Sequence, residues 1–249
     1  MNKRKLTLLI SGGTLIVAGV VSTLLTEGMD TPIPFALSLI AVVVGLFLLP
    51  IGFIKPKNKV DVRTLSMAAL FAALCYVGFT YCKIDIPVGM EKTAFHLGNV
   101  FCVLAALFLG GFWGGMAGAV GMTIADLTTA YVTSAPKTFL LKLCIGLITG
   151  LVAHKIFHIS RDRERKIPLT VATLISCIAG MAFNVVADPL VGYFYKMYIL
   201  GVPQEAANIW AKIGAVTTSV NAVVAVIAAT VLYMALRKAM KRSNLLPKL

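Results

Sequence analysis

The sequence predicts an all-α integral membrane protein, a bundle of eight transmembrane helices. Its 249 residues are 59% hydrophobic and 13% charged, and the mean hydropathy is +0.90, which is too apolar for an ordinary soluble domain. The apolar residues gather in runs of the length that a bilayer core of ~30 Å requires, about 20 residues of helix. The net charge of +13 does not indicate a nucleic-acid partner, because the basic residues form short clusters between the apolar runs.

Eight apolar runs are candidate membrane spans. They lie at residues 6–26, 33–54, 64–81, 96–109, 112–131, 138–157, 168–188 and 209–236. The first run follows MNKRK, as the apolar part of a secretory signal does, but it is too long and no small-residue cleavage site follows it. We therefore expect a spanning helix there. The fourth run is short, and the turn GGFWGG joins it to the fifth.

The distribution of Lys and Arg predicts the orientation of the spans. If the N-terminus is cytoplasmic, most of the 23 basic residues fall in inner segments, where the positive-inside rule places them. An even number of spans then puts both termini in the cytoplasm. We expect a multi-pass protein of the cell membrane.

The motifs of several function classes are missing from the sequence. No hydrophilic stretch is long enough for a soluble catalytic domain, and GxxxxGK[ST] is absent, so ATP energy would have to come from a partner. HExxH and GxSxG are absent as well, so we do not expect an enzyme. The five cysteines form no CxxC pair and are expected to be packing residues. We assign no metal and no cofactor.

Two of the runs carry small residues four positions apart, a spacing that lets another helix approach closely. In TLSMAALFAALCYV the pairs are Ala68 with Ala72 and Ala69 with Ala73. In the fifth run the rows are Gly110, Gly114 and Gly118, and Gly111, Gly115 and Ala119. We expect the glycine rows to pack inside the bundle. The alanine pairs suit either internal packing or the docking of a partner.

Five stretches of the chain together resemble a known family: AALFAAL, KIDIPVGMEKTA, FHLGNVFCVLAALFLGG, ADLTTAYVTSAPKT and NVVADPLVGY. Over about residues 60–240 the chain resembles the substrate-binding S component of energy-coupling factor (ECF) vitamin transporters, especially the riboflavin-transporter-like branch. The resemblance implies six helices around a ligand site near the outer face, a loop that covers the site, and an AxxxA motif that docks on a transmembrane coupling protein with two ATPases. It places the lid at residues 83–95. It places the docking surface at Ala68, Ala69, Ala72 and Ala73.

The resemblance also divides the chain and implies its function. Residues 1–56 are an N-terminal two-helix membrane extension, and residues 57–249 a six-helix substrate-binding membrane domain. The implied function is the substrate-binding subunit of an ATP-driven importer of a vitamin or related small molecule. Riboflavin is suggested by the branch, while pyridoxine-like compounds, thiamine precursors and pantothenate suit the same residue types. The alternative is a stand-alone proton-coupled secondary transporter of a small polar solute, in which Asp126 or Asp188 binds the proton.

Polar side chains inside or beside the spans are the candidate substrate-binding residues, because such groups are costly in a bilayer and usually face a cavity or a partner. They are His96, Asn99, Asp126, Tyr131, Lys142, Asn184, Asp188 and Asn221. Asp126 and Lys142 are equally far from the middle of the loop between the fifth and sixth spans, so antiparallel helices place them at one depth and within reach. They form either a structural ion pair or a pair that contacts ligand.

The other candidates also have two interpretations each. Asn184 and Asp188 share one face of the seventh span, where Pro189 is expected to end the helix, so that Asp188 could instead cap the next segment. His96 and Asn99 are expected to open the fourth span, and Asn221 to lie in the eighth as a ligand contact or as a hydrogen bond between helices. The aromatic residues near the outer ends suit either ring stacking or an interfacial belt. They are Tyr131, Tyr193, Tyr195 and Trp210.

Overall fold

The computed structural model describes residues 14, 62–89, 91–161 and 165–243. The chain divides into two units, Met1–Lys57 and Asn58–Leu249, and the second contains almost all of the described residues. The expected spans at residues 6–26 and 33–54 lie outside the described residues, and the two-helix extension stays a prediction.

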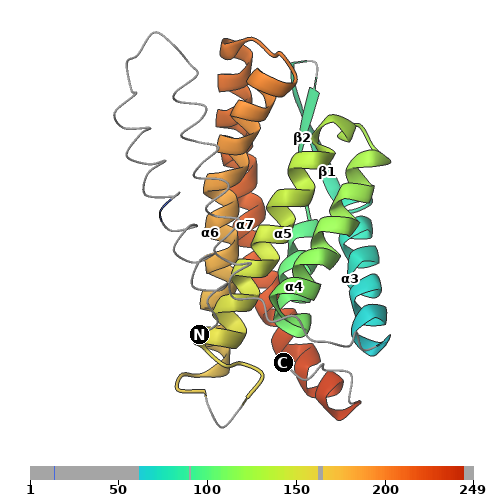
Figure 1. Cartoon of the computed structure of the whole chain (residues 1–249), viewed down its shortest axis with the longest axis vertical. Helices are drawn as coiled ribbons and strands as arrows, with labels where there is room; N and C mark the ends of the chain where they lie inside the picture. Colours follow the sequence, from blue (N-terminus) through green and yellow to red (C-terminus); the bar gives the residue numbers. More distant parts are fainter. Residues whose placement is uncertain (1–13, 15–61, 90, 162–164, 244–249) are drawn as a thin grey trace. The chain divides into compact units, whose positions relative to one another are not determined.

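The second unit is built from long apolar helices and one short β-hairpin (Figure 1). In chain order the elements are α3 (Val62–Thr80), β1 (Lys83–Val88), β2 (Glu91–His96), α4 (Gly98–Leu127), η1 (Val132–Ser134), α5 (Ala135–Leu151), η2 (Val152–Ile156), α6 (Leu169–Phe194), η3 (Tyr195–Ile199) and α7 (Gln204–Arg242). Among the described residues, five helices are long and apolar enough to cross a membrane. The predicted helical membrane protein is therefore confirmed at this level.

The helix α4 consists of two arms that fold back on each other. Gly110 breaks it with φ of 80° and ψ of 174°, a backbone conformation that suits glycine because it has no Cβ. Gly114 packs against Ala106 and Gly118 against Cys102, so the arms 98–109 and 111–127 run antiparallel with no room for a side chain between them. The turn predicted in GGFWGG is thus present, and the close packing of the first glycine row lies inside the bundle.

The second glycine row faces α5. A Cβ on Gly115 would stand 2.8 Å from the carbonyl oxygen of Leu143, and one on Gly111 would stand 3.0 Å from that of Leu147. Gly146 and Gly115 contact each other through their backbones. Both predicted rows therefore serve contacts within the chain, as small residues do between membrane helices.

The alanine pairs of α3 lie on two different faces. Ala68 is buried, and the carbonyl of Ala72 packs against Gly121 of α4. Ala69 and Ala73 are exposed. Neighbouring positions on a helix are about 100° apart, so two overlapping pairs cannot share one surface. A docking surface made of all four alanines does not fit this arrangement, because Ala68 is buried and Ala72 is partly buried against α4, whereas Ala69 and Ala73 are exposed.

The segment after α3 differs from the loop that the sequence suggested. The strands β1 and β2 form an antiparallel hairpin in which Lys83 faces His96 and Val88 faces Glu91. Gly89 follows Val88 with φ of 61°, as a tight hairpin turn requires. His96 therefore ends β2 and does not open a helix, whereas Asn99 lies in the first turn of α4.

Pro189 does not end its helix, contrary to the sequence prediction. The helix α6 continues through Pro189 to Phe194, and the π-helical turn η3 follows. A proline removes one backbone hydrogen bond, and in membrane helices neighbouring groups compensate for such a loss. Asp188 consequently caps no new helix, and its carboxylate is used for contacts between helices.

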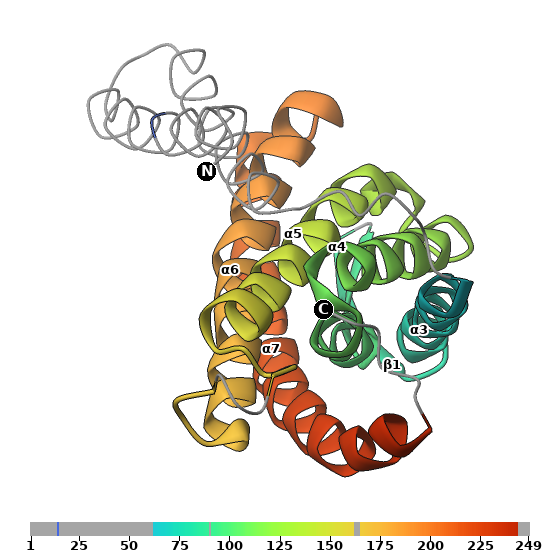
Figure 2. The same cartoon turned by 60° about the horizontal axis from the view of Figure 1, so that its bottom comes forward.

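The helices pack in a fixed order around α4. Figure 2 shows α3 and α5 on either side of α4, and α6 beside α7. α4 is apolar all round and mostly buried, as a central helix should be. Outward-facing apolar side chains on α7, such as Val216, Val223 and Val231, are more than half exposed and suit contact with lipid.

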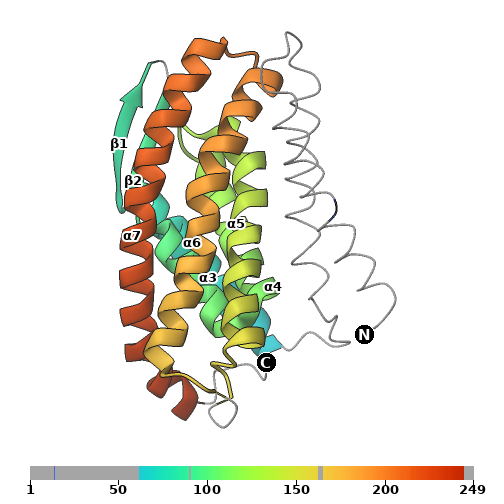
Figure 3. The ribbon, with the colours of Figure 1, turned by 90° about the vertical axis from the view of Figure 1, so that its left-hand side faces the viewer.

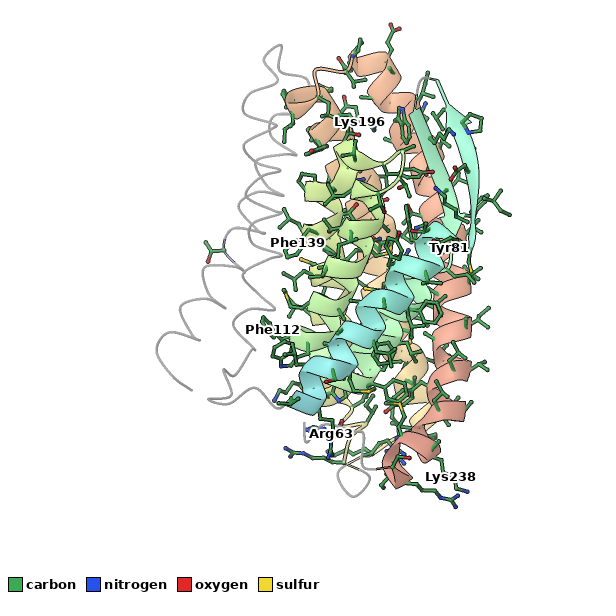
Figure 4. All side chains as sticks on the ribbon, turned by 90° about the vertical axis from the view of Figure 1, so that its right-hand side faces the viewer. Arg63, Tyr81, Phe112, Phe139, Lys196 and Lys238 are labelled. Carbon is green, nitrogen blue, oxygen red and sulfur yellow. The ribbon has the colours of Figure 1, made fainter. Side chains whose placement is uncertain are left out.

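The β-hairpin lies along α7 near one end of the bundle (Figure 3). Arg63 and Lys238 lie at the opposite end, whereas Lys196 lies at the end that carries the hairpin (Figure 4). The two ends of the bundle therefore differ, with the start of α3 and the C-terminal part of α7 together at one of them.

Candidate functional site

A cavity of about 110 Å³ lies between the hairpin, α4, α5, α6 and α7. All eight candidate residues from the sequence line it, namely His96, Asn99, Asp126, Tyr131, Lys142, Asn184, Asp188 and Asn221. Residues that the sequence analysis did not select line it as well, among them Phe79, Lys92, Lys137, Thr138, Lys196, Thr217 and Thr218. Side chains that are up to 142 positions apart in the sequence, Phe79 and Asn221, therefore meet in one place.

The fold of α4 brings two of the candidates together. Because the arms of α4 are antiparallel, Gly98 at the start of the first arm packs against Met122 in the second. Asn99 and Asp126 consequently lie at the same end of the two antiparallel arms of α4, although 27 positions of sequence separate them. Lys142 on α5 and Asn184 on α6 complete this side of the cavity.

Four buried polar atoms of the lining have no hydrogen-bond partner among the described residues. They are Nδ1 of His96, Oδ1 of Asn99, Oδ2 of Asp126 and Oδ1 of Asn184. Asn99, Asp126 and Asn184 are only 1–2% exposed. Nearly all buried polar groups in native proteins are hydrogen-bonded, so an unpartnered cluster around one cavity indicates a place where another molecule supplies the bonds.

Asp188 forms the ion pair of the cavity, with Lys137. The Lys137 Nζ and Asp188 Oδ1 atoms are 2.8 Å apart, and the Thr218 hydroxyl donates a 2.9 Å hydrogen bond to the other carboxylate oxygen. The expected pair of Asp126 with Lys142 is not formed in the described part of the chain; Asp85, on β1, pairs with Lys83.

Asp188 pairs with Lys137, and Asp126 does not pair with Lys142, because of where α5 begins. The sequence predicts that this helix begins at residue 138, which leaves Lys137 in a loop, whereas the helix begins at Ala135. Lys137 then lies in the first turn, where it reaches Asp188 on α6. The Thr138 hydroxyl lies beside the Asp126 carboxylate instead. Equal depth was therefore a correct argument for a shared cavity, but it did not select the ion pair.

Asn221 ties the hairpin to α7. Its side-chain amide donates a 3.0 Å hydrogen bond to the backbone carbonyl of Ala94, and its Oδ1 accepts a 3.0 Å bond from the backbone N–H of His96. The amide thus pairs with β2 as a neighbouring strand would. Of the two interpretations of Asn221, the structure shows the hydrogen bond between elements, at a position that also lines the cavity.

A second set of contacts holds the other strand. The Tyr131 hydroxyl donates a 2.8 Å hydrogen bond to Asp85 on β1, and the Lys83 ammonium lies 3.3 Å from the same carboxylate and 4.8 Å from the centre of the Tyr131 ring. Burial alone would raise the pKa of Asp85, but the bonds from Tyr131 and Lys83 outweigh it and lower that pKa. Burial and the bond to Asp85 raise the pKa of Tyr131. At neutral pH Asp85 is an anion and Tyr131 a neutral donor.

His96 contributes a neutral imidazole to the cavity. Burial and the nearby Lys142 ammonium lower the pKa of His96 to about 3, so the ring carries no charge at physiological pH. Its ring packs edge-on against Phe79, with the centroids 4.7 Å apart. A neutral imidazole offers one N–H donor and one acceptor, which suits hydrogen bonding to an uncharged part of a ligand.

Two of the four aromatic candidates line the cavity. These are Tyr131 and Trp210, and the Lys196 ammonium lies 4.0 Å from the centre of the Trp210 ring. Tyr193 and Tyr195 are not part of the lining. Within the described residues no three His, Cys, Asp or Glu side chains come together as a metal site would require.

Comparison with protein families identifies the chain. Residues 58–238 match the family described as ECF-type riboflavin transporter, S component. The chain belongs to this family. No curated protein and no solved structure matches the chain. The resemblance predicted from the sequence is thereby confirmed.

Membership of the family establishes the general role of the chain. It is a multi-pass membrane protein of vitamin transport, and its family comprises substrate-binding transporter components rather than enzymes. S components work together with a substrate and with ECF-module partners.

Proposed function

We propose that this protein is the substrate-binding subunit of an ATP-driven ECF-type importer and that the cavity is its substrate site. One observation supports this most strongly. In a chain of the S-component family, the eight polar residues selected from the sequence converge on one cavity, and four of their buried atoms lack a partner among the described residues. The protein binds its substrate and performs no chemistry on it.

The substrate is a vitamin or a related small molecule, and a flavin-like ring is our specific proposal. Ligand sites commonly combine apolar and aromatic walls with a few placed polar groups. Phe79, Tyr131 and Trp210 supply rings, while Asn99 and Asn184 supply amides that a ligand can bond. The family description names riboflavin, and this lining suits a planar ring with hydrogen-bonding edges.

The cavity must enlarge to admit such a ring. A protein cavity of about 150 Å³ holds benzene, and the present volume of about 110 Å³ is smaller still. The element best suited to move is the β-hairpin, because the side-chain hydrogen bonds that tie it to the rest of the described residues come from Asn221 on one side and Tyr131 on the other. We propose that the hairpin is the lid, in place of the irregular loop expected at residues 83–95.

The bundle is oriented with the cavity toward the outside and both termini in the cytoplasm of the cell. Arg63 and Lys238 lie at the end away from the hairpin, where the positive-inside rule favours the cytoplasm (Figure 4). The six helices of the proposed S-component fold are then α3, the two arms of α4, α5, α6 and α7, with the two N-terminal spans added. The accessible pair of Ala69 and Ala73 is the proposed contact with a transmembrane coupling protein that carries two ATPases.

Uptake measurements test the proposal. Radiolabelled riboflavin should accumulate in cells that make this protein together with an ECF coupling protein and its ATPases, and purified protein should bind riboflavin or a related vitamin. Uptake that continues without the coupling protein and the ATPases would contradict the ATP-driven mechanism. It would favour the proton-coupled carrier, with Asp126 or Asp188 as the proton-binding group.

A further inference from the structure

The charges around the cavity are not balanced. Six lysine and aspartate side chains line it: Lys92, Lys137, Lys142, Lys196, Asp126 and Asp188. Even if Lys196 is left out, because its ammonium lies over the Trp210 ring, the lysines outnumber the aspartates by three to two. His96 does not change this balance, since its imidazole is neutral at physiological pH.

The contacts within the lining leave one buried ammonium to be explained. Asp188 is already bonded to Lys137 and to the Thr218 hydroxyl, and Lys92 is exposed on the hairpin, where water can solvate it. Lys142 is only 7% exposed and has no ion pair within the described residues. An ammonium in such a place is costly unless an acceptor of opposite charge compensates it, above all at membrane depth.

We propose that the ligand carries an acidic group, a carboxylate or a phosphate, that binds Lys142. The amides of Asn99 and Asn184 line the same cavity and can add hydrogen bonds to the group. Asp126 remains as an acceptor for donors elsewhere on the ligand. This inference rests on the proposed function and narrows its substrate class, because riboflavin itself carries no charge at neutral pH and would offer Lys142 no charged partner.

Matched pairs of ligands test the charge preference. Flavin mononucleotide and riboflavin differ in a phosphate, and pantothenate and panthenol differ in a carboxylate. Binding of all four to the purified full-length protein is measured by calorimetry and by thermal unfolding. In at least one pair the acidic member should bind at least about tenfold more tightly, which is the effect expected for a hydrogen bond to a charged group.

Variants assign the preference to Lys142. The substitutions Lys142→Met and Lys142→Gln should reduce the ratio of the two affinities to about one. The control Lys212→Met removes an equal charge from an exposed site on α7 that is not part of the lining, and it should leave the ratio unchanged. Thermal unfolding without ligand verifies that each variant is folded.

The possible outcomes separate the two proposals. Equal or tighter binding of both neutral members, or a preference that persists in the folded Lys142 variants, would overturn the acidic-group inference and leave the importer function standing. If none of the four compounds binds to the folded wild-type protein, the flavin-like substrate of the proposed function and the acidic-group inference are both contradicted.

Discussion

Replacement of Asn221 should loosen the β-hairpin without disturbing the helices. Asn221→Ala removes two 3.0 Å hydrogen bonds, one to the backbone carbonyl of Ala94 and one from the backbone N–H of His96. A hydrogen bond contributes about 0.5–1.5 kcal/mol net, so the closed hairpin should lose about 1–3 kcal/mol. If closure holds the ligand in place, the ligand should leave about 5- to 150-fold faster.

Two measurements check this prediction. Hydrogen exchange should show faster exchange of the backbone amides of residues 83–96, and stopped-flow experiments should show faster ligand release. Ser219→Ala is the matched control, because the Ser219 hydroxyl donates its hydrogen bond to the carbonyl of Ala215 within the same helix α7. If Asn221→Ala leaves both the exchange of the hairpin and the release rate at the level of this control, Asn221 does not hold the lid and the reasoning is wrong.

Three further predictions follow from the structure. Ala73→Trp should block uptake but leave ligand binding intact, because Ala73 is exposed on α3. Ala72→Trp should instead destabilise the fold, because Ala72 packs against Gly121. Normal uptake by the Ala73→Trp variant would contradict the proposed docking surface. The lowered pKa of Asp85 predicts that its contribution to hairpin closure is complete above the ordinary Asp value of about 3.9 and is lost only as the pH falls through the lower folded value. Hydrogen exchange of the hairpin, corrected for intrinsic rates, should therefore not change between about pH 5 and 8, and a loosening within that range would argue against this assignment. Asn184→Leu should abolish ligand binding but keep or raise the unfolding temperature of the ligand-free protein. The reason is that an apolar group replaces a buried amide whose Oδ1 has no hydrogen-bond partner among the described residues. A large loss of stability would show that the amide is structural.

The sequence predicted which polar residues share a cavity better than it predicted the contacts among them. Polar groups inside apolar helices are costly, so each of the eight candidates had a physical reason to face a cavity, and all eight do. The partner of each group depends on where helices begin and how they rotate. For this reason Lys137, rather than Lys142, pairs with an aspartate. Thr217 and Thr218 were missed because hydroxyls are common in membrane helices and often bond their own backbone, as Thr217 does with the carbonyl of Ile213.

The fold, like the contacts in the cavity, could be predicted from the sequence only in part. The turn at Gly110 and the small-residue packing could be predicted because glycine has a unique backbone range and no side chain. The hairpin of β1 and β2 could not, because each strand has only six residues and β1 contains Pro87, which argues against a strand. The backbone bonds of the hairpin and the contribution of Asn221 from α7 decide this segment, and that contact spans more than 120 positions of sequence.

The central claim is that the cavity holds the transported molecule, and native mass spectrometry tests it most directly. The full-length wild-type protein and the Asn184→Leu variant are purified in parallel after incubation with a mixture of vitamins and their acidic and neutral derivatives. The account predicts one bound small molecule on the wild-type protein and none on the folded variant. The same bound mass on both proteins would show that the ligand lies elsewhere and would contradict the claim.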